Sequence, residues 1–187
     1  MAPITATRDL SPELGDAIAG ESNQRHLTEV LRTTLEEAIK LRASCGFLLL
    51  VIDDLGRIND MHGSETRNAV IAAVQKRLRT QLRGKDHFGR YGSDKFGVVI
   101  NNCTPDAMQV AAERLLAGVR DEIVETDIGP LAVTVTIGGV IAPRHGRTVR
   151  EVLARAQEAI NEAKVSGGGA FQAYRPNAEQ PKFARAS

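Results

Sequence analysis

The stretch HFGRYGSDKFGVVI, residues 87–100, predicts a β-hairpin with a polar tip. Its two halves, HFGRY and KFGVVI, have strand character, and the Gly-Ser-Asp between them is typical of a tight turn. The tip carries an acid, Asp94, and a lysine, Lys95, follows it directly. Two hypotheses remain open at this point: a catalytic hairpin, or a hairpin that has lost its chemistry.

The segments around this hairpin predict alternating helices and strands. The apolar run GFLLLVI indicates a buried strand over residues 46–53, and helical spacing of apolar residues predicts a helix over 24–43. The other expected elements are a helix from Ser64 to Gly84, a helix capped by Thr104, a half-buried strand over 131–142 that a weaker strand at 122–126 can join, a helix from the capping box 148–151, and a strand in 170–174.

This order of elements predicts an α+β fold, in which helices pack on a mainly antiparallel sheet. A strand, a crossover helix and a hairpin can bring a carboxylate on the strand close to one at the hairpin tip. Such a pair can hold two divalent metal ions for nucleotidyl transfer. We expect a flexible leader over 1–15, one domain over 16–175 and a linker-like tail over 176–187.

The composition narrows the class of function. A net charge of +1 argues against general electrostatic binding to nucleic acid or to a membrane surface. The longest apolar run is too short to span a bilayer, and the N-terminus has no apolar signal region, so we expect a cytoplasmic domain. Two cysteines without metal-type spacing fit buried thiols, and four scattered histidines suggest no metal cluster.

Five short segments occur in an order and spacing that identify a family. They are INDMHG (58–63), RYGSDKFG (90–97), AER (112–114), VTVTIG (133–138) and EAK (162–164). Together they resemble the GGDEF domain of bacterial diguanylate cyclases over roughly residues 16–175. The resemblance implies a five-stranded, mainly antiparallel central sheet surrounded by helices, like the palm of nucleotide cyclases. It also implies an activity, in which two facing domains condense two GTP into cyclic di-GMP.

The metal ligands and motif residues that the resemblance implies are only partly present. The family places a metal-binding Asp where this chain has Val51, and Asp53 lies two residues on, about 7 Å further along a strand. The third motif residue, Asp94, is retained as the remaining metal and catalytic candidate, with Asp53 as a weak second. We therefore expect Mg²⁺ only where GTP binds.

The motif itself departs from the family in two positions. Gly92 is retained, Ser93 replaces the second glycine and Lys95 replaces the glutamate. The side chain of Ser93 lies where the nucleotide must pass, although its hydroxyl can donate a hydrogen bond. Lys95 weakens Mg²⁺ affinity electrostatically and can itself bind a phosphate or carboxylate.

Of the nucleotide-binding residues that the resemblance implies, some are retained and others are replaced. Asn59 matches a guanine-binding Asn, but Asn68 replaces the guanine-binding Asp. An amide cannot supply the paired acceptors of a carboxylate to the guanine edge. Lys164 matches a phosphate-binding Lys, whereas Gly168 replaces an Arg, and DAIAGESNQR (16–25) retains only part of an opening family element.

A second site of the family binds cyclic di-GMP as an inhibitor. Its RxxD element is present as RGKD (83–86), in register with the motif, and Arg114 lies where a further Arg joins from a facing domain. Arg83, Asp86 and Arg114 can bind phosphate and guanine edges. The alternative is structural: Arg83 favours a helix C-terminus, Asp86 starts a strand and Arg114 is an exposed helix residue.

These observations favour a degenerate, catalytically inactive GGDEF domain that binds cyclic di-GMP or GTP and controls a neighbouring sensor or EAL phosphodiesterase domain. A first alternative is a weakly active diguanylate cyclase that uses Asp94 and Asp53. A second is an interaction domain that forms a homodimer or docks on a partner independently of nucleotide.

Overall fold

The computed structural model describes residues 12–176, with side chains from residue 23 onward. Most of the expected leader (1–11) and of the expected tail (177–187) lies outside the described residues. The elements are α1 (Pro12–Leu41), β1 (Cys45–Ile52), α2 (Leu55–Thr80), β2 (His87–Arg90), β3 (Lys95–Asn101), α3 (Pro105–Arg120), β4 (Val124–Thr126), β5 (Gly129–Leu131), β6 (Val135–Ala142), α4 (Val149–Val165) and β7 (Phe171–Ala173).

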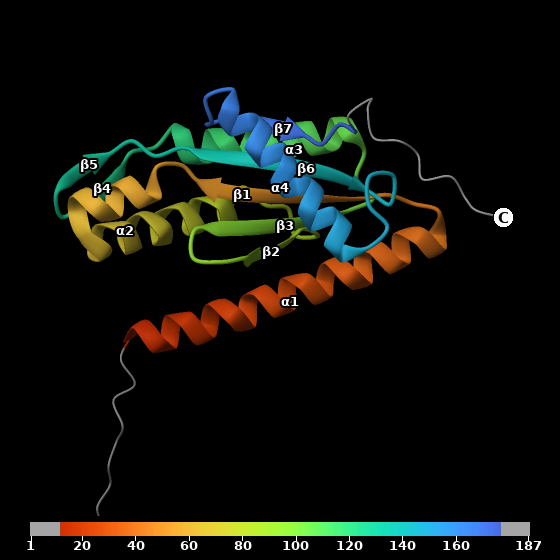
Figure 1. The fold of residues 1–187 in the computed structure, drawn as a ribbon, viewed down its shortest axis with the longest axis horizontal. Helices are drawn as coiled ribbons and strands as arrows, with labels where there is room; N and C mark the ends of the chain where they lie inside the picture. The colour runs from red at the N-terminus through yellow and green to blue at the C-terminus, as the bar shows by residue number, and fades with distance from the viewer. Residues whose placement is uncertain (1–11, 177–187) are drawn as a thin grey trace, which may run out of the picture.

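Five strands form the central sheet, in the order β2-β3-β1-β6-β7 (Figure 1). β1 pairs antiparallel with both β3 and β6, β2 pairs antiparallel with β3, and β7 joins β6 in parallel. The predicted α+β fold with a mainly antiparallel five-stranded sheet is thus confirmed. β4 and β5 form a separate two-stranded sheet.

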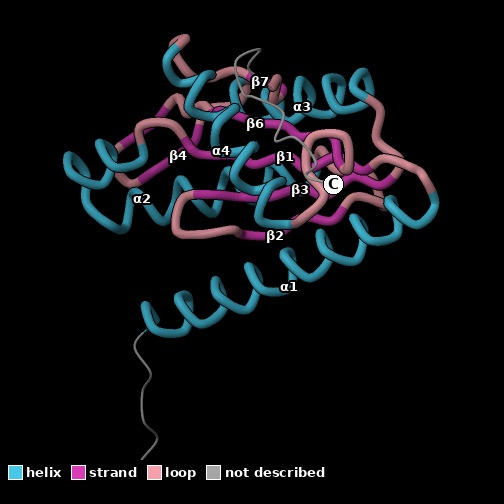
Figure 2. Tube along the Cα trace, turned by 45° about the vertical axis from the view of Figure 1, so that its right-hand side comes forward, coloured by secondary structure: helices cyan, strands magenta, loops and turns pink. Residues whose placement is uncertain are grey.

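Helices cover both faces of this sheet, as the tube view shows (Figure 2). α1 and α4 pack on the face that carries Phe47, Leu49 and Val51, and α2 and α3 pack on the face that carries Leu48 and Leu50. β1 is therefore buried on both sides, as its unbroken apolar run predicted. No helix among the described residues has the length and hydropathy needed to cross a membrane.

β6 lies within the range 131–142 in which a strand was predicted. It is buried on both faces, so the prediction that this strand is half-buried is wrong. The alternation of valine and threonine suggested that one face of the strand is exposed to solvent, but Thr136 is fully buried. Its hydroxyl donates to the Asp53 carboxylate at 2.6 Å, which lets a polar side chain lie in the interior. The weaker strand at 122–126 pairs with β5 through its residues 124–126 and does not join β6.

The helix boundaries also differ from the sequence expectation. α1 begins at Pro12 instead of residue 24. The polar segment after β1 and the helix expected from Ser64 are one element, α2, which is kinked at Gly63 (φ 85°). α2 ends at Thr80, before the Gly84 that was expected to end it.

The helix caps expected at Thr104 and Thr148 are confirmed, whereas Ser64, expected to cap a helix, lies inside α2 directly after its kink. The Thr104 hydroxyl accepts the backbone N–H of Ala107 at 3.2 Å, and the Thr148 hydroxyl accepts that of Glu151 at 3.2 Å. The Glu151 carboxylate accepts the backbone N–H of Arg147 at 2.8 Å, which helps to lower the pKa of Glu151. These caps set where α3 and α4 begin.

α4 lies very close to β6, because Gly138 has no side chain. A Cβ at position 138 would lie 2.3 Å from the Ala156 carbonyl oxygen and 2.9 Å from the Ile160 nitrogen. Both of those atoms belong to the α4 backbone, so no side-chain rotation relieves the clash. The approach of α4 to the sheet therefore depends on this glycine.

We predict that Gly138→Ala lowers the free energy of unfolding by about 1–3 kcal/mol, because α4 must move away from β6. Urea unfolding followed by circular dichroism measures this change. Gly56→Ala is the matched control, since a Cβ at position 56 has nothing within 4 Å and alanine favours the helix. Equal stability of the two variants would contradict the proposed close contact.

Candidate functional site

The predicted hairpin is present, and its tip lies beside the C-terminal end of β1. Val51 on β1 is the cross-strand partner of Lys95 on β3, and the backbone N–H of Ile52 donates to the Asp94 carbonyl at 3.3 Å. The Arg90 guanidinium donates to the carbonyls of Gly92 and Ser93, at 2.9 Å each. Sequence analysis did not single out Arg90, which here holds the shape of the turn.

The carboxylate of Asp94 is partly exposed at this tip. It accepts a long hydrogen bond, 3.4 Å, from the hydroxyl of its neighbour Ser93. Among the residues with described side chains, no group of three or more His, Cys, Asp and Glu is arranged to hold a metal ion. The structure thus leaves Asp94 partly accessible to solvent, outside any group of three or more such residues in the described part of the chain.

Val51 and Lys95 project from the sheet toward α4. Val51 is 3% exposed and belongs to the apolar cluster under α1 and α4. The Lys95 ammonium, partly buried, donates to the Gln157 side-chain oxygen on α4 at 2.9 Å. The Gln157 amide in turn donates to Asn161 at 3.1 Å, and Lys164 lies one turn further on.

Asp53 is occupied by hydrogen bonds within the protein. One carboxylate oxygen accepts the Thr136 hydroxyl at 2.6 Å, and the other accepts the Thr134 hydroxyl at 2.7 Å and the backbone N–H of Gly169 at 3.1 Å. These contacts join the end of β1, β6 and the loop after α4. The arrangement supports a structural role for Asp53, because a metal would compete with three donors already in place.

We predict that Asp53→Ala lowers the free energy of unfolding by about 3 kcal/mol, because the buried Thr136 hydroxyl loses its acceptor. Chemical denaturation measures the loss. Asp60→Ala, at an exposed position of α2, is the control and should change stability by less than about 0.5 kcal/mol. A similarly small change in Asp53→Ala would show that this carboxylate does not hold the three segments together.

The residues expected to contact a nucleotide lie on two helices. Asn59 is partly buried before the kink of α2, and Asn68 is exposed after it, where it accepts a hydrogen bond of 3.4 Å from Arg67. Lys164 is exposed in the last turn of α4. Gly168 lies against Asp53, since a Cβ placed there would be 3.6 Å from its Oδ1.

The RGKD segment forms a turn that the C-terminus of α2 enters. The Asp86 carboxylate accepts the backbone N–H of Arg83 at 3.0 Å, and the Asp86 N–H donates to the Arg83 carbonyl at 2.9 Å. The Arg114 guanidinium, on α3, donates through Nε to the Gln81 carbonyl at 2.6 Å. Arg114 thus contacts the C-cap residue of α2, two residues before Arg83, and Arg83 itself is exposed.

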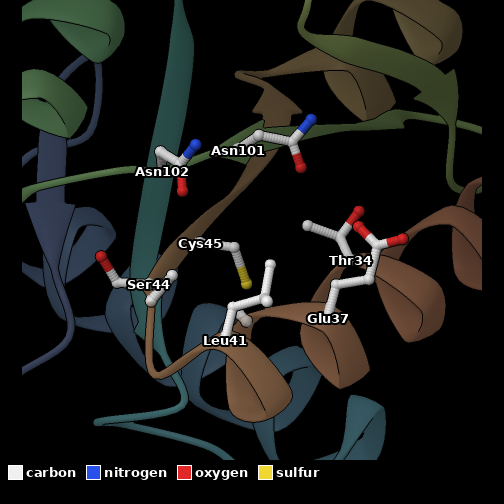
Figure 3. Close-up of a pocket in the computed structure, with 9 residues that line it drawn as sticks. Thr34, Glu37, Leu41, Ser44, Cys45, Asn101 and Asn102 are labelled. Atoms are coloured by element: carbon white, nitrogen blue, oxygen red, sulfur yellow. The ribbon is translucent and has the colours of Figure 1, made fainter.

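A hollow of about 160 Å³ opens at the other end of β1 (Figure 3). Side chains from the end of α1, the start of β1 and the end of β3 line it, among them Glu37, Cys45 and Asn101. Burial raises the pKa of Cys45 to about 11, so its thiol stays protonated at neutral pH. This hollow lies away from the hairpin tip, and none of the sequence motifs points to it.

Comparison with known proteins gives one family. A family model described as "Diguanylate cyclase, GGDEF domain" matches residues 14–170. Diguanylate cyclase A of Treponema denticola is 27% identical over 134 residues, which are 72% of this chain and 36% of that protein. Cyclic di-GMP phosphodiesterase NbdA of Pseudomonas aeruginosa is 26% identical over 152 residues, which are 81% of this chain and 19% of that protein.

A solved structure has the same architecture. The GGDEF domain of PA1120 (YfiN or TpbB) from Pseudomonas aeruginosa superposes with a TM-score of 0.79 at 25% identity, covering 83% of this chain and 97% of that one. The chain spans only 19% to 36% of the two curated relatives named above. The similarity therefore concerns this domain and not the whole length of those proteins.

Proposed function

Because the chain belongs to the GGDEF family of diguanylate cyclases, we propose that this domain is a regulatory module that binds cyclic di-GMP through Arg83, Asp86 and Arg114, or GTP in the former catalytic pocket. It has no useful cyclase activity of its own. The observation that carries the proposal is a contrast between two sites. Arg83 and Asp86 share one turn and Arg114 contacts the helix end that leads into it, while no group of three or more metal-binding side chains is found among the residues with described side chains.

The chemistry of the RGKD turn supports recognition of a cyclic dinucleotide. Arg83 presents an exposed guanidinium, which can bind a phosphate or the O6 and N7 of guanine through two parallel hydrogen bonds. Asp86 keeps the turn closed through its bond to the Arg83 N–H, and its second oxygen can accept from a guanine edge. Arg114 is anchored by Nε, and its terminal nitrogens can meet a phosphate.

The loss of catalysis rests on the metal ligands. The resemblance assigns a metal-binding aspartate to position 51, and a buried valine occupies it. Asp53 cannot replace that ligand without giving up its bonds to Thr134, Thr136 and Gly169. Two divalent ions normally activate the attacking hydroxyl and neutralise phosphate charge, so their loss costs orders of magnitude in rate.

The proposed regulatory role is supported by the kind of protein in which a similar domain occurs. NbdA is named as a cyclic di-GMP phosphodiesterase, and this chain matches 19% of its length. A nucleotide-binding domain of this kind can report ligand occupancy to a neighbouring sensor or EAL phosphodiesterase domain. In this proposal the module works in the bacterial cytoplasm, where GTP and cyclic di-GMP are available.

We predict that titration calorimetry with cyclic di-GMP gives a binding isotherm for the wild type. Arg83→Ala should weaken it by about tenfold or more, because a charge-assisted bond to the ligand is lost. Lys85→Ala is the matched control, since it removes a neighbouring cation of the same exposed turn and should retain the wild-type affinity. An isotherm that Arg83→Ala leaves unchanged, or no heat with the wild type, would reject this binding site.

We also predict that prolonged incubation with GTP and Mg²⁺ or Mn²⁺ yields no cyclic di-GMP at high protein concentration. Chromatography of the nucleotides measures the product. If product forms, Asp94→Ala shows whether the remaining carboxylate of the hairpin tip is responsible. Product that Asp94→Ala abolishes would establish the weakly active cyclase in place of the inactive module.

A further inference from the structure

Beside the hairpin tip, two positions carry side chains whose charge differs from the charge that the family resemblance implies. The family resemblance assigns carboxylates to positions 51 and 95, and this chain has an aliphatic and a cationic side chain there. Because Val51 and Lys95 are cross-strand partners, the formal charge of one pair of neighbouring positions changes from −2 to +1. The pair of positions where the resemblance implies bound divalent cations is now itself positive.

The donors that remain do not fit a divalent metal. Mg²⁺ prefers oxygen ligands, and carboxylates supply its charge compensation in proteins. Val51 has no donor atom, the Asp53 carboxylate is committed to three hydrogen bonds, and Asp94 is followed directly by an ammonium group. An adjacent ammonium opposes the binding of a second cation.

The Lys95 ammonium is held in place by the fold. Its stem leaves β3 next to Val51, and its head donates to Gln157 at 2.9 Å, which uses one of its three donors. Gln157 is itself held by Asn161 at 3.1 Å. Since residues 157, 161 and 164 share one face of α4, Lys95 and Lys164 lie at the two ends of a single polar row.

From this arrangement we infer that the former catalytic pocket binds the phosphate chain of a guanosine triphosphate without a divalent metal, with the Lys95 ammonium as its fixed cation. This inference rests on the GTP-binding part of the proposed function. A lysine can act as a point charge toward phosphate oxygens and has two donors free to do so once Gln157 has accepted one. The pocket is then a GTP receptor whose occupancy does not require Mg²⁺.

The test is calorimetric titration of the protein with GTP, once in excess EDTA and once in excess MgCl₂. We expect binding in EDTA, with an affinity in MgCl₂ that is no higher, because excess Mg²⁺ converts GTP to its Mg²⁺ complex and neutralises part of the phosphate charge that Lys95 attracts. Lys95→Met, which keeps the aliphatic stem and removes the charge, should weaken GTP binding by about tenfold or more in both buffers. Lys76→Ala is the matched control, because it removes an exposed lysine from α2.

Lys95→Glu extends the test by reversing the charge. We expect it to abolish GTP binding in EDTA, since two carboxylates at residues 94 and 95 then repel the phosphates. Thermal unfolding and the cyclic di-GMP isotherm show that each variant is folded. Retention of that isotherm also separates the pocket from the Arg83 turn.

GTP binding by the wild type only when Mg²⁺ is present would overturn the inference. GTP binding by Lys95→Met that equals that of the wild type would overturn it as well. If cyclic di-GMP gives a heat of binding and GTP gives none in either buffer, the inference is rejected, but the proposed binding of cyclic di-GMP is retained. Absence of heat with both nucleotides would reject the proposed function together with it.

Discussion

The carboxylate of Asp53 joins three segments that are far apart in sequence: the end of β1, the strand β6 and the loop that follows α4. It accepts hydroxyl groups from Thr134 and Thr136 and the backbone N–H of Gly169. These bonds satisfy the Thr136 side chain, so β6 can be buried on both faces with a polar residue in its middle. With β6 in place, Gly138 lets α4 approach the sheet, and the loop after α4 lies against Asp53, Thr134 and Thr136.

These hydrogen bonds also bear on the chemistry that we propose for the neighbouring hairpin tip. A carboxylate that accepts three internal hydrogen bonds stabilises the fold, and a metal would have to compete with those three donors. The neighbouring positions reinforce this outcome, because Val51 belongs to the apolar core and Lys95 is directed to Gln157. The end of β1 and the start of β3 are therefore organised here by packing and by an internal cation, which is the basis of our proposal that this region binds an anionic ligand.

The RGKD turn (residues 83–86) is held by local hydrogen bonds, unlike the contacts of Asp53. Its geometry is local, since Asp86 and Arg83 bond each other's backbone, while the approach of Arg114 comes from the packing of α3 against the end of α2. The Arg114 bond to the Gln81 carbonyl also stabilises a helix terminus. A structural and a ligand-binding use of these residues are therefore compatible.

The sequence alone determined the α+β class, the buried β1, the hairpin and the Thr104 and Thr148 caps, because these depend on periodicity and on short-range bonds. It also supplied each candidate site residue, through motifs at fixed spacing. The tertiary structure decided that Thr136 is buried, that Asp53 is committed to internal donors, that Arg90 closes the turn and that Lys95 meets Gln157. Those contacts link residues distant in the chain or set a side-chain direction, and a linear pattern carries no information on either until the strands and helices have packed.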